Sequence, residues 1–590
     1  MLDDTAPFIL LDDARAAAAP GRLYERPLAI VEARRPDEVR PALAQLKDAL
    51  ARGLHAAGYI AYEAGHALEP RLARFRVEAG GDSPPLLWFG LFREFSTVTD
   101  VRALLPDPAG AWIAPPVPLT SRDDYEASVA VVKEHIAAGD IYQANLTFSA
   151  EVRTAGHPLA IYAAIRERAQ AGHGGIIHTG NHWILSFSPE LFFALSARTL
   201  TTRPMKGTAE RRADATDDAS AAAELQADPK QRAENLMIVD LLRNDLARVA
   251  KPGTVRVPAL FTVETYPTIH QLVSTVTAEM EEGRDAVDVL DAIFPCGSIT
   301  GAPKIRAMEI IDGLEPAPRN VYTGAIGRIA PGGDASFNVA IRTLTMQAGQ
   351  QVARIGLGSG VVADSRPADE WRECLAKGAF LAGGRSFDLI ETMRFDPHDG
   401  VVELERHLAR MKASAEALGF SFDRHAARNE LQAATFRLRT EKKLRLALSQ
   451  SGAIAIQTGP MPPSPSGPVT AALARLPVAA DDYRLRHKTS ERHFLDGARR
   501  TAGTFEVVFH DSHGFITEGS FTNVFIRRGG RLLTPPLGRG LLPGILRQRL
   551  IEDGEAEEAD LTADDLADGF FVGNSVRGLL DAVLHPALQG

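Results

Sequence analysis

Cysteine is scarce in this chain of 590 residues, because Cys296 and Cys374 are its only two. Two cysteines cannot build a disulfide framework, which fits a reducing environment. The sequence also lacks an apolar run of about 18 residues and the short apolar core of a signal peptide. We therefore expect a cytoplasmic protein without a membrane span or an export signal.

Positive charge is not concentrated anywhere along the chain. The formal net charge is −10, and no block of Lys and Arg resembles a nucleic-acid-binding patch, so we exclude nucleic acid as a partner. Apolar residues are plentiful at 45%, which is ample for large cores. The length favours roughly four domain-sized units.

Changes in composition divide the chain into three parts. A proline-rich stretch at 114–118 ends a first part, residues 1–115, and a glycine-rich junction near 382–385 ends a second, residues 116–381. The third part, residues 386–590, has an internal linker at about 459–468. We expect a mixed α/β protein of the α+β kind.

Periodicity predicts local elements within these parts. Apolar spacing indicates helices near 39–57, at 121–138 and at 403–418, and the second should have Ser121 as its N-cap with Asp124 in the capping box. Alternation predicts strands at 58–65, 505–510, 515–518 and 520–527, the last three in a hairpin pattern.

Lys206 lies in the run Pro204-Met205-Lys206-Gly207-Thr208, where the glycine predicts a tight turn, and Glu190 lies 16 residues earlier in Ser188-Pro189-Glu190. A lysine amine attacks carbon only when deprotonated, and a carboxylic acid donates a proton only when its pKa is raised. The pair therefore offers a candidate nucleophile and a candidate acid. The alternative is a lysine on a surface turn and an ordinary loop carboxylate.

Four segments strengthen the catalytic interpretation, because they resemble the chorismate-utilising enzymes. They are 139–146 (GDIYQANL), 186–192 (SFSPELF), 233–245 (AENLMIVDLLRND) and 294–304 (FPCGSITGAPK). They occur in the order typical of that family and span roughly residues 120–380. The resemblance implies a chorismate-binding fold of large antiparallel sheets flanked by helices.

The same resemblance implies a magnesium site. Glu234 and Glu373 fall on the family's metal-ligand positions, and Glu370 should share a helix face with Glu373. The alternative for the last two is a solvated ion-pair stripe with Lys377. Gln231 departs from the family, which often has a glutamate there, so a metal role at that position is lost.

Two positions indicate which reaction of the family to expect. Family members that add water to chorismate have a lysine where Gln143 stands, and anthranilate synthases have an alanine where Lys206 stands. Lys206 instead fits the aminodeoxychorismate synthases, in which this lysine attacks C2 of chorismate while Glu190 would protonate the departing C4 hydroxyl. Ammonia would then add at C4.

Further site residues follow from the resemblance. His270 falls on the family's active-site histidine, for which we expect a binding or orienting role. The remaining substrate-binding candidates are Tyr322, Arg342, Lys377 and the backbone N–H groups of Gly301, Ala302 and Gly360.

The C-terminal third resembles the class IV pyridoxal-phosphate enzymes, of fold type IV with two α/β subdomains. The matching segments are 387–394 (FDLIETMR), 407–411 (HLARM), 516–525 (ITEGSFTNVF) and 541–547 (LLPGILR). The resemblance implies that Lys488 forms a Schiff base with the cofactor. The nearby Arg486 and His487 are expected to help lower its pKa. Glu518 would pair with the pyridine nitrogen and Arg410 with the phosphate. The other implied cofactor contacts are Asn523, Gly544 and Ile545.

Two features of this third depart from the family. Leu546 stands where Thr or Met is more common, and few residues separate Arg410 from Lys488. Some cofactor contacts are therefore expected to be rearranged.

Together the two resemblances imply a bifunctional enzyme of folate synthesis. It would aminate chorismate and then release pyruvate from the product to give 4-aminobenzoate. Neither cysteine lies in a nucleophile elbow, so we expect ammonia from a separate glutamine amidotransferase, and a homodimer through the third part. The alternatives are an anthranilate-type synthase fused to an aminotransferase, and a C-terminal part that is a non-catalytic dimerisation domain.

Overall fold

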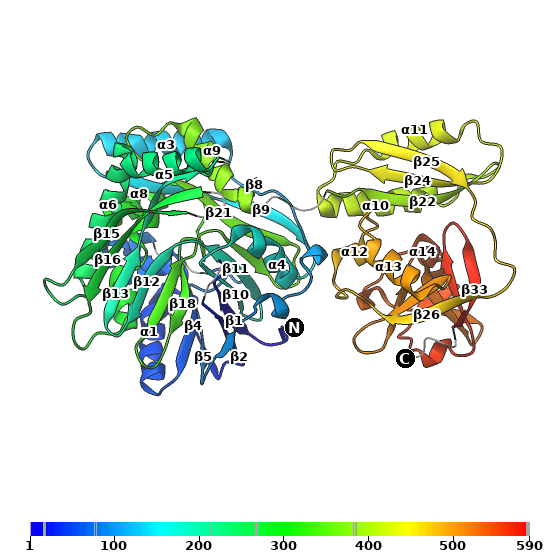
Figure 1. Ribbon diagram of the computed structural model, residues 1–590, viewed down its shortest axis with the longest axis horizontal. Coiled ribbons are helices and arrows are strands. Elements are labelled where there is room, and N and C mark those ends of the chain that lie inside the picture. Colours follow the sequence, from blue (N-terminus) through cyan, green and yellow to red (C-terminus); the bar gives the residue numbers. More distant parts are fainter. Residues whose placement is uncertain are drawn as a thin grey trace. The chain divides into compact units, whose positions relative to one another are not determined.

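The computed structural model describes residues 2–15, 19–75, 77, 79–212, 214–265, 269–381, 383 and 386–585. The chain forms two compact units (Figure 1). The first consists of Met1–Leu105, Pro115–Val152 and Tyr162–Ala382, and the second of Pro106–Ala114, Arg153–Ile161 and Gly383–Gly590. Most of the predicted junction at 382–385 lies outside the described residues.

Two large antiparallel sheets form the first unit. The strand order of the eleven-stranded sheet is β17 (Gly301–Ala302), β9 (Gln143–Ala155), β21 (Val352–Val361), β20 (Thr343–Gln347), β11 (His182–Ser188), β10 (His173–His178), β1 (Phe8–Asp12), β2 (Gly21–Glu25) and β6 (Ser96–Val98), with β8 (Val117–Pro118) paired to β9. The remaining strand, β7 (Trp112–Ile113), pairs with the last two residues of β9, and these four residues belong to the second unit. The order of the ten-stranded sheet is β14 (Met205–Glu210), β16 (Ile269–Glu279), β13 (Thr199–Arg203), β12 (Leu191–Ser196), β19 (Ala335–Val339), β18 (Ala325–Ile329), β4 (His55–Ile60), β5 (Leu87–Phe92) and β3 (Ala29–Ala33), with β15 (Arg256–Thr265) paired to β16.

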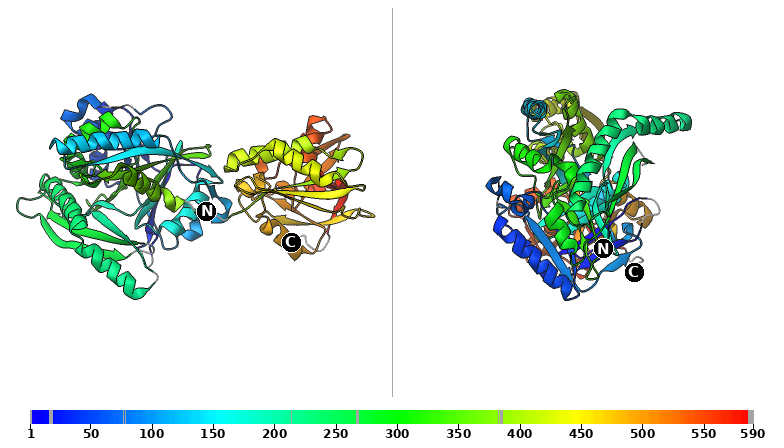
Figure 2. Two further views of the ribbon diagram at one scale, coloured as in Figure 1. Left: turned by 90° about the horizontal axis from the view of Figure 1, so that it is seen from above. Right: turned by 90° about the vertical axis from the view of Figure 1, so that its left-hand side faces the viewer.

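The two sheets pack face to face. One buried cluster joins Ile9 and Ile177 of the eleven-stranded sheet to Tyr59 and Ile326 of the ten-stranded sheet. A larger cluster lies between the ten-stranded sheet and its helices. The helices in this part of the chain are α1 (Pro36–Ala51), α2 (Ala64–Leu68), α3 (Arg122–Ala137), α4 (Pro158–Ala169), α5 (Ala215–Ala227), α6 (Pro229–Ala247), α7 (Ala286–Ile293), α8 (Lys304–Leu314) and α9 (Pro367–Gly378). Helices α5 and α6, in sea green, lie against β14, β15 and β16 (Figure 2).

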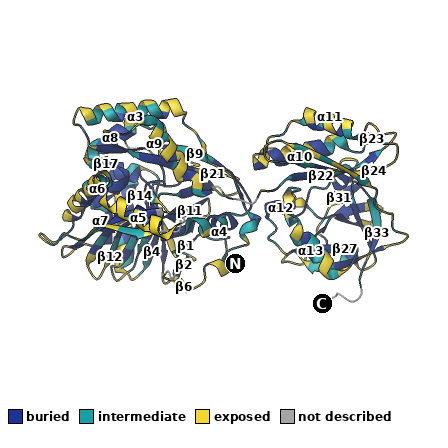
Figure 3. Ribbon diagram, turned by 45° about the horizontal axis from the view of Figure 1, so that its top comes forward, coloured by how far each residue is buried: buried dark blue, intermediate teal, exposed yellow. Residues whose placement is uncertain are grey.

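The second unit contains two smaller sheets. The four-stranded sheet has the order β23 (Gly400–Val401), β22 (Leu389–Asp396), β24 (Lys442–Leu448) and β25 (Ile454–Pro460). The eight-stranded sheet has the order β28 (Ile516–Gly519), β27 (Glu506–His510), β26 (Val469–Arg475), β33 (Gly578–Leu584), β32 (Phe570–Asn574), β29 (Asn523–Arg528), β30 (Arg531–Thr534) and β31 (Ala556–Glu558). The helices are α10 (Leu404–Leu418), α11 (Arg424–Thr435), α12 (Tyr483–Arg486), α13 (His493–Ala502) and α14 (Ile545–Glu552). In both units the strands are largely buried, whereas α3, α5 and α11 have exposed faces (Figure 3).

The second unit includes a short piece of the preceding chain in its core. Trp112, on β7, is 8% exposed and belongs to the same buried cluster as Phe387, Leu418 and Tyr483. Gly419, the C-cap residue of α10 with a φ of +65°, lies in van der Waals range of the Trp112 ring. Residues 106–114, together with Ala155 of β9, therefore help to close a core whose other buried members follow residue 386.

The structure confirms the mixed α/β class and most predicted helices. Helix α3 begins after Ser121, whose hydroxyl accepts the Asp124 N–H as an N-cap should, and α10 ends at Leu418 as expected. The predicted helix over 39–57 is wrong at its end, because the chain turns at 52–53 and β4 starts at His55. Residues 64–65, expected in a strand, begin α2.

Two turn predictions also need correction. Lys206 lies within strand β14 at a register shift against β16, not in a turn between elements. In the second unit β27 pairs with β28 as a hairpin, but β29 pairs with β30 and β32 and not with β28. Among the residues that the structure describes, no helix is long and apolar enough to cross a membrane.

Candidate active sites

Lys206 is placed by a bulge in β14. The pairing of β14 with β16 shifts register between Met205 and Thr208, and Gly207 has a φ of +92°. Glycine adopts this conformation without strain, and a Cβ there would come within 2.9 Å of the Gln231 side-chain oxygen on α6. The bulge thus aims Lys206 while keeping the strand against α6.

The Lys206 amine ends beside two residues of the eleven-stranded sheet. A Cβ placed on Gly360 of β21 would lie 2.9 Å from Lys206 Nζ and 3.0 Å from Gln143 Nε2. Gln143 is 1% exposed, and neither atom of its amide has a hydrogen-bond partner among the residues that the structure describes. A buried amide without partners costs free energy unless a ligand satisfies it. The structure therefore brings these three predicted residues together around a place suited to a polar ligand.

Electrostatics favour the neutral amine of Lys206. Burial is the main cause of its lowered pKa, and the Lys377 ammonium acts in the same direction, while Glu234, Glu373 and Glu190 oppose it. The resulting pKa lies below that of an ordinary lysine, as a nucleophilic amine requires.

Glu190 is held in the loop between β11 and β12 and is 6% exposed. Its backbone N–H donates to Ser188 Oγ at 3.2 Å, and that hydroxyl donates to the Val339 carbonyl at 2.6 Å. Burial raises the pKa of Glu190 to about 7, against a hydrogen bond from Ser298 and the charge of Lys206, which lower it. A carboxyl group in this state can act as an acid near neutral pH.

The three predicted metal ligands come from α6 and α9. Glu373 Oε1 lies 2.7 Å from Lys377 Nζ, and Lys377 also donates to the Gly358 carbonyl at 2.9 Å. Glu370 Oε2 is buried, without a hydrogen-bond partner within the described part of the chain. Burial raises the pKa of Glu234; it also acts to raise that of Glu373, but Lys377 outweighs it and the pKa is lowered. No group of three or more His, Cys, Asp or Glu side chains is preassembled for a metal among the described residues.

His270 is engaged on both ring nitrogens. Its Nε2 lies 2.9 Å from Asp218 Oδ1 on α5, and its Nδ1 lies 3.0 Å from Thr265 Oγ1. Asp218 in turn is bound by Arg211 and accepts the Arg212 N–H, which together hold its pKa well below the usual range. The histidine is therefore fixed by an aspartate that the sequence motifs did not reveal.

Tyr322 and Arg342, two predicted substrate-binding residues, each make a contact that involves an aromatic ring. The Tyr322 ring packs over Gly356, where a Cβ would come within 2.0 Å of it. The Arg342 guanidinium lies 5.8 Å from the centre of the Phe380 ring, and burial lowers its pKa. Tyr322 therefore packs on β21, the strand that carries Gly360.

Gly301 and Ala302 form β17 and pair with Ala144 and Gln143. Gly301 has a φ of +155°, and a Cβ there would collide with the Gln143 carbonyl at 2.3 Å. Only glycine allows the loop to approach β9 so closely. These predicted substrate-binding residues are thus brought against Gln143.

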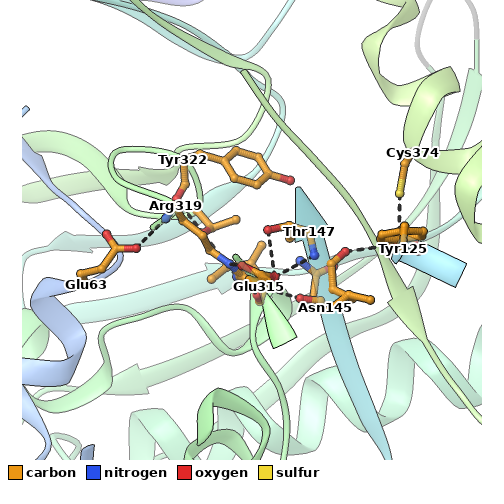
Figure 4. Close-up of polar contacts among 12 residues, drawn as sticks. Glu63, Tyr125, Asn145, Thr147, Glu315, Arg319, Tyr322 and Cys374 are labelled. Carbon is orange, nitrogen blue, oxygen red and sulfur yellow. Dashed lines mark hydrogen bonds and ion pairs between the residues drawn. The ribbon is translucent and has the colours of Figure 1, made fainter. Parts of the chain in front are cut away.

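A buried polar network supports this part of the sheet (Figure 4). Arg319 donates two bonds to Glu315, at 2.7 and 2.8 Å, and one to the Asn145 carbonyl. Glu315 also accepts from the backbone and hydroxyl of Thr147. A cavity of about 750 Å³ borders the network and is lined by Tyr322 but not by Lys206 or Glu190. Sequence reasoning missed this network, because Asn145 and Thr147 lie far along the chain from the Glu315–Arg319 pair and their hydrogen bonds to it have no local signature.

Lys488, in the second unit, lies between α12 and α13. Its carbonyl accepts the Ile390 N–H at 2.8 Å, which ties it to β22. Burial, followed by the charge of Arg410, lowers the pKa of Lys488 to about 7, with Arg492 and Arg445 also contributing. The largest charges that act on this amine thus belong to residues other than Arg486 and His487, whose help stays a prediction.

Glu518, on β28, is 3% exposed, and one of its two carboxylate oxygens has no hydrogen-bond partner among the described residues. Its Oε2 accepts the Leu542 N–H at 3.0 Å, whereas Oε1 is buried without a partner among the described residues. Burial raises its pKa to about 7, against the opposing charge of Arg492. The free oxygen is suited to accept a hydrogen bond from a ring N–H.

The predicted phosphate contacts surround the start of α14. Gly544 is its N-cap residue and Ile545 its first residue. A Cβ on Gly544 would lie 1.8 Å from Asn523 Oδ1, so the glycine allows the loop to close over that side chain. Arg410 donates to the Pro543 carbonyl at 2.9 Å and forms two bonds to Glu391. A helix N-terminus beside an arginine favours an anion such as phosphate.

Comparison with known proteins agrees with this arrangement. Residues 9–383 match the chorismate binding enzyme family, and residues 388–583 match amino-transferase class IV. The first match covers more than half of the chain, which therefore belongs to the chorismate binding enzyme family. The class IV match implies pyridoxal phosphate as the cofactor of the second unit.

Particular relatives fall into two groups. The chain is 40% identical over 298 residues to aminodeoxychorismate synthase component 1 of Bacillus subtilis, covering 50% of this chain and 62% of the relative. It is 37% identical over 306 residues to anthranilate synthase component 1 of Haloferax volcanii, covering 51% and 58%. The chain thus spans about six tenths of the length of these relatives.

A solved structure shows the same fold. Anthranilate synthase component I from Streptococcus pneumoniae matches with a TM-score of 0.54 and 24% identity, covering 62% of this chain and 93% of that one.

Proposed function

We propose that the chain is a bifunctional enzyme that converts chorismate and ammonia into 4-aminobenzoate for folate. The first unit aminates chorismate to 4-amino-4-deoxychorismate, and the second eliminates pyruvate from that product. The relatives named aminodeoxychorismate synthase component 1 support the first step. The class IV match supports a pyridoxal-phosphate-dependent second step.

One observation carries the first step: Glu190 is buried, Lys206 is half-buried and close enough for the two charges to interact, and loss of solvent favours the neutral form of each. The neutral amine of Lys206 forms a bond to C2 of chorismate. The ring double bonds shift, the C4–O bond breaks, and the hydroxyl leaves as water with the Glu190 proton. Ammonia then forms a bond to C4, and Lys206 leaves from C2. Two easier displacements replace one difficult one.

Neighbouring residues bind and orient the ring. Gln143 cannot act as a base near neutral pH, so its two unpartnered amide atoms suit hydrogen bonding to substrate and not activation of water. Arg342, Tyr322 and Lys377 are assigned to the substrate carboxylates, together with the backbone of Gly301, Ala302 and Gly360. His270, fixed by Asp218, is assigned an orienting role.

The carboxylates of α6 and α9 fit a Mg²⁺ ion. Magnesium is commonly held by one or two protein carboxylates with retained waters, so three preassembled ligands are not needed. The negative charges of Glu234 and Glu373 both act to raise the pKa of Lys206, so both carboxylates lie close to that amine. Glu370 has a buried oxygen without a hydrogen-bond partner among the described residues. These three residues would hold the ion, which would neutralise a substrate carboxylate when bound.

The second step uses the residues around Lys488. Lys488, Glu518, Arg410, Asn523, Gly544 and Ile545 would hold the cofactor, and the unused oxygen of Glu518 fits its ring nitrogen. When bound, pyridoxal phosphate supplies an electron sink at the substrate amine. Lys488, whose pKa is about 7, is assigned to remove the C4 proton. The C3–O bond then breaks, pyruvate leaves, and the ring becomes aromatic.

Two partners belong to this proposal. A separate glutamine amidotransferase supplies ammonia, and a second copy of the chain pairs through the second unit. The competing candidate is an anthranilate-type synthase, favoured by relatives such as the Haloferax volcanii protein. The two candidates differ in product, since amination at C2 gives anthranilate and amination at C4 gives 4-aminobenzoate.

Changing Lys206→Ala tests the proposal. Without the nucleophile, chorismate amination with ammonium should fall by at least roughly 100-fold. Elimination of pyruvate from supplied 4-amino-4-deoxychorismate should continue, because Lys206 lies in the other unit. Products would be identified by chromatography and mass spectrometry.

Lys251→Ala is the matched control, because this lysine is exposed and pairs only weakly with Glu279 at 3.7 Å. It should retain wild-type amination. A Lys206→Ala enzyme that aminates C4 at the wild-type rate would remove the nucleophile assignment, and anthranilate as the wild-type product would favour the competing candidate.

A further inference from the structure

Lys488 extends the four-stranded sheet of the second unit beyond β22. Its carbonyl accepts the Ile390 N–H, and Thr489 forms an antiparallel bridge with Leu389. Residues paired across antiparallel strands point to the same face of a sheet. Lys488 and its partner Ile390 therefore share a face, opposite to that of Leu389, which belongs to the hydrophobic core.

The same face continues across β24. Register pairs Ile390 with Ala447 and Thr392 with Arg445. The intervening residues of β24, Leu444, Leu446 and Leu448, are all buried in the core cluster. Since side chains alternate along a strand, Ala447 and Arg445 face the Lys488 side. This face, which we call the platform, has Lys488 at its edge, Ile390 and Ala447 in the middle, and Arg445 beyond.

Arg445 differs from Arg410 and Arg492, the other two arginines that act on Lys488, because its side chain has no polar partner among the described residues. Arg410 is bonded to Glu391, and Arg492 donates to the Ser520 carbonyl. Arg445 is exposed and has no hydrogen-bond or ion-pair partner within the described part of the chain. Its charge contributes to the lowered pKa of Lys488, after burial and Arg410, which places it within electrostatic reach of that amine.

The geometry points to Arg445 as the residue that binds the ring carboxylate of the second site's substrate, with Ile390 and Ala447 as the apolar floor beneath the ring. This inference rests on the proposed function. The amine at C4 and the carboxylate at C1 lie at opposite ends of a six-membered ring. Two strand spacings and two residues along β24 separate the Cα atoms of Lys488 and Arg445 by roughly 12 Å. Two long side chains with such a ring between them can span that distance.

An arginine is chemically suited to this role. Its planar fork donates two parallel hydrogen bonds to a carboxylate, and the charge is permanent. Thr392 and Gln457 flank it on the same face through the pairing of β22, β24 and β25. The platform therefore selects flat cyclic amines that have a carboxylate opposite the amine.

The test uses the full chain loaded with pyridoxal phosphate and supplied with 4-amino-4-deoxychorismate, so that the first unit is bypassed. Arg445→Gln should raise KM for 4-aminobenzoate formation by about 10- to 100-fold, the loss expected when a charged hydrogen-bonded pair is broken. The change in kcat should be much smaller, because Arg445 touches neither the C4 proton nor the leaving group. Lys443→Gln, which removes another exposed cation from the same face of β24, should leave KM within about twofold.

A binding measurement gives a second readout without turnover. Addition of 4-aminobenzoate or aniline would be followed through the visible absorbance of the bound cofactor. The wild type should prefer 4-aminobenzoate, and Arg445→Gln should lose that preference while still binding aniline. Unchanged absorbance before ligand addition would show that the site is intact. If Arg445→Gln lost the cofactor, Arg445→Met, which also removes the charge, would be tested in its place.

Unchanged KM together with an unchanged preference in Arg445→Gln would overturn the inference, while the proposed function would stand if the wild type still made 4-aminobenzoate. If the wild type made none, the proposed function would fail. The binding preference would then still decide whether Arg445 reads a carboxylate.

Discussion

Lys206 and Glu190, the proposed nucleophile and acid, show how burial shifts the pKa values of an amine and a carboxyl group toward their neutral forms. Water stabilises an ammonium and a carboxylate alike, so removing it disfavours both charges and moves the two pKa values toward each other. Burial is the largest cause of each shift in this site, and the mutual attraction of the pair opposes both. Burial therefore favours the neutral amine and the neutral acid together, which the proposed first reaction requires.

The Glu190 shift predicts a falling limb in the pH profile of the first reaction. Glu190 must be protonated to assist departure of the C4 hydroxyl, and its pKa is about 7, so kcat should decline as the pH rises through about 7. The measurement is chorismate amination at saturating free ammonia at each pH. Glu190→Gln should be slow throughout and should lose this limb. A wild-type rate that stays level through neutral pH would contradict the role of Glu190 as the acid.

At the scale of elements, the first site depends on helices α6 and α9. Glu234 comes from α6, and Glu370 and Glu373 share one side of α9. Asn235, next to Glu234, anchors α6 to the sheet, since its side chain accepts from Ser274 at 2.6 Å. The helix thus presents its carboxylate beside β14, where Lys206 lies.

Chelation should separate the two reactions. EDTA should abolish chorismate amination and spare elimination of pyruvate from 4-amino-4-deoxychorismate, because the proposed Mg²⁺ ligands all lie in the first unit. Glu234→Gln and Glu373→Gln should each reproduce the effect of EDTA, and added Mg²⁺ should restore only the wild type. Undiminished chorismate consumption in EDTA would mean that these carboxylates are structural.

The burial of strand β7 leads to a prediction about the stability of the second unit. Trp112 is almost fully buried in the core of the second unit. Trp112→Ala should therefore lower the free energy of unfolding of the second unit by about 3–5 kcal/mol. Denaturant unfolding followed through the cofactor absorbance would measure this. Val117→Ala, which shortens a side chain 63% exposed, should have little effect. An unchanged midpoint in Trp112→Ala would show that β7 is dispensable to that core.

At the scale of the whole molecule, motifs predicted residues better than their surroundings. Lys206, Gln143 and Gly360 were predicted from family resemblance, and the fold brings them together although they come from three segments. Asp218 and Arg319 were not predicted. His270 lies 52 residues from Asp218, and Asn145, whose carbonyl Arg319 binds, lies 174 residues from Arg319, so only the folded chain brings these residues together.

Local signals also failed where tertiary packing decided the outcome. The alanine-rich pattern after Pro36 continues past the true helix end at Ala51, because the following residues are needed to pair with β5. The bulge at Gly207 could not be told from a turn, since both require a glycine with positive φ. The contribution of β7 to the second unit had no sequence signal.

The central claim, that one chain performs both reactions in order, is tested most directly with Lys488→Ala. Wild-type protein, chorismate and ammonium should yield 4-aminobenzoate and pyruvate. The variant should still consume chorismate but accumulate 4-amino-4-deoxychorismate, because the base at C4 and the cofactor tether are gone while the first unit is untouched. A separate lyase added afterwards should release 4-aminobenzoate. Undiminished 4-aminobenzoate formation by the unaided variant would contradict the account.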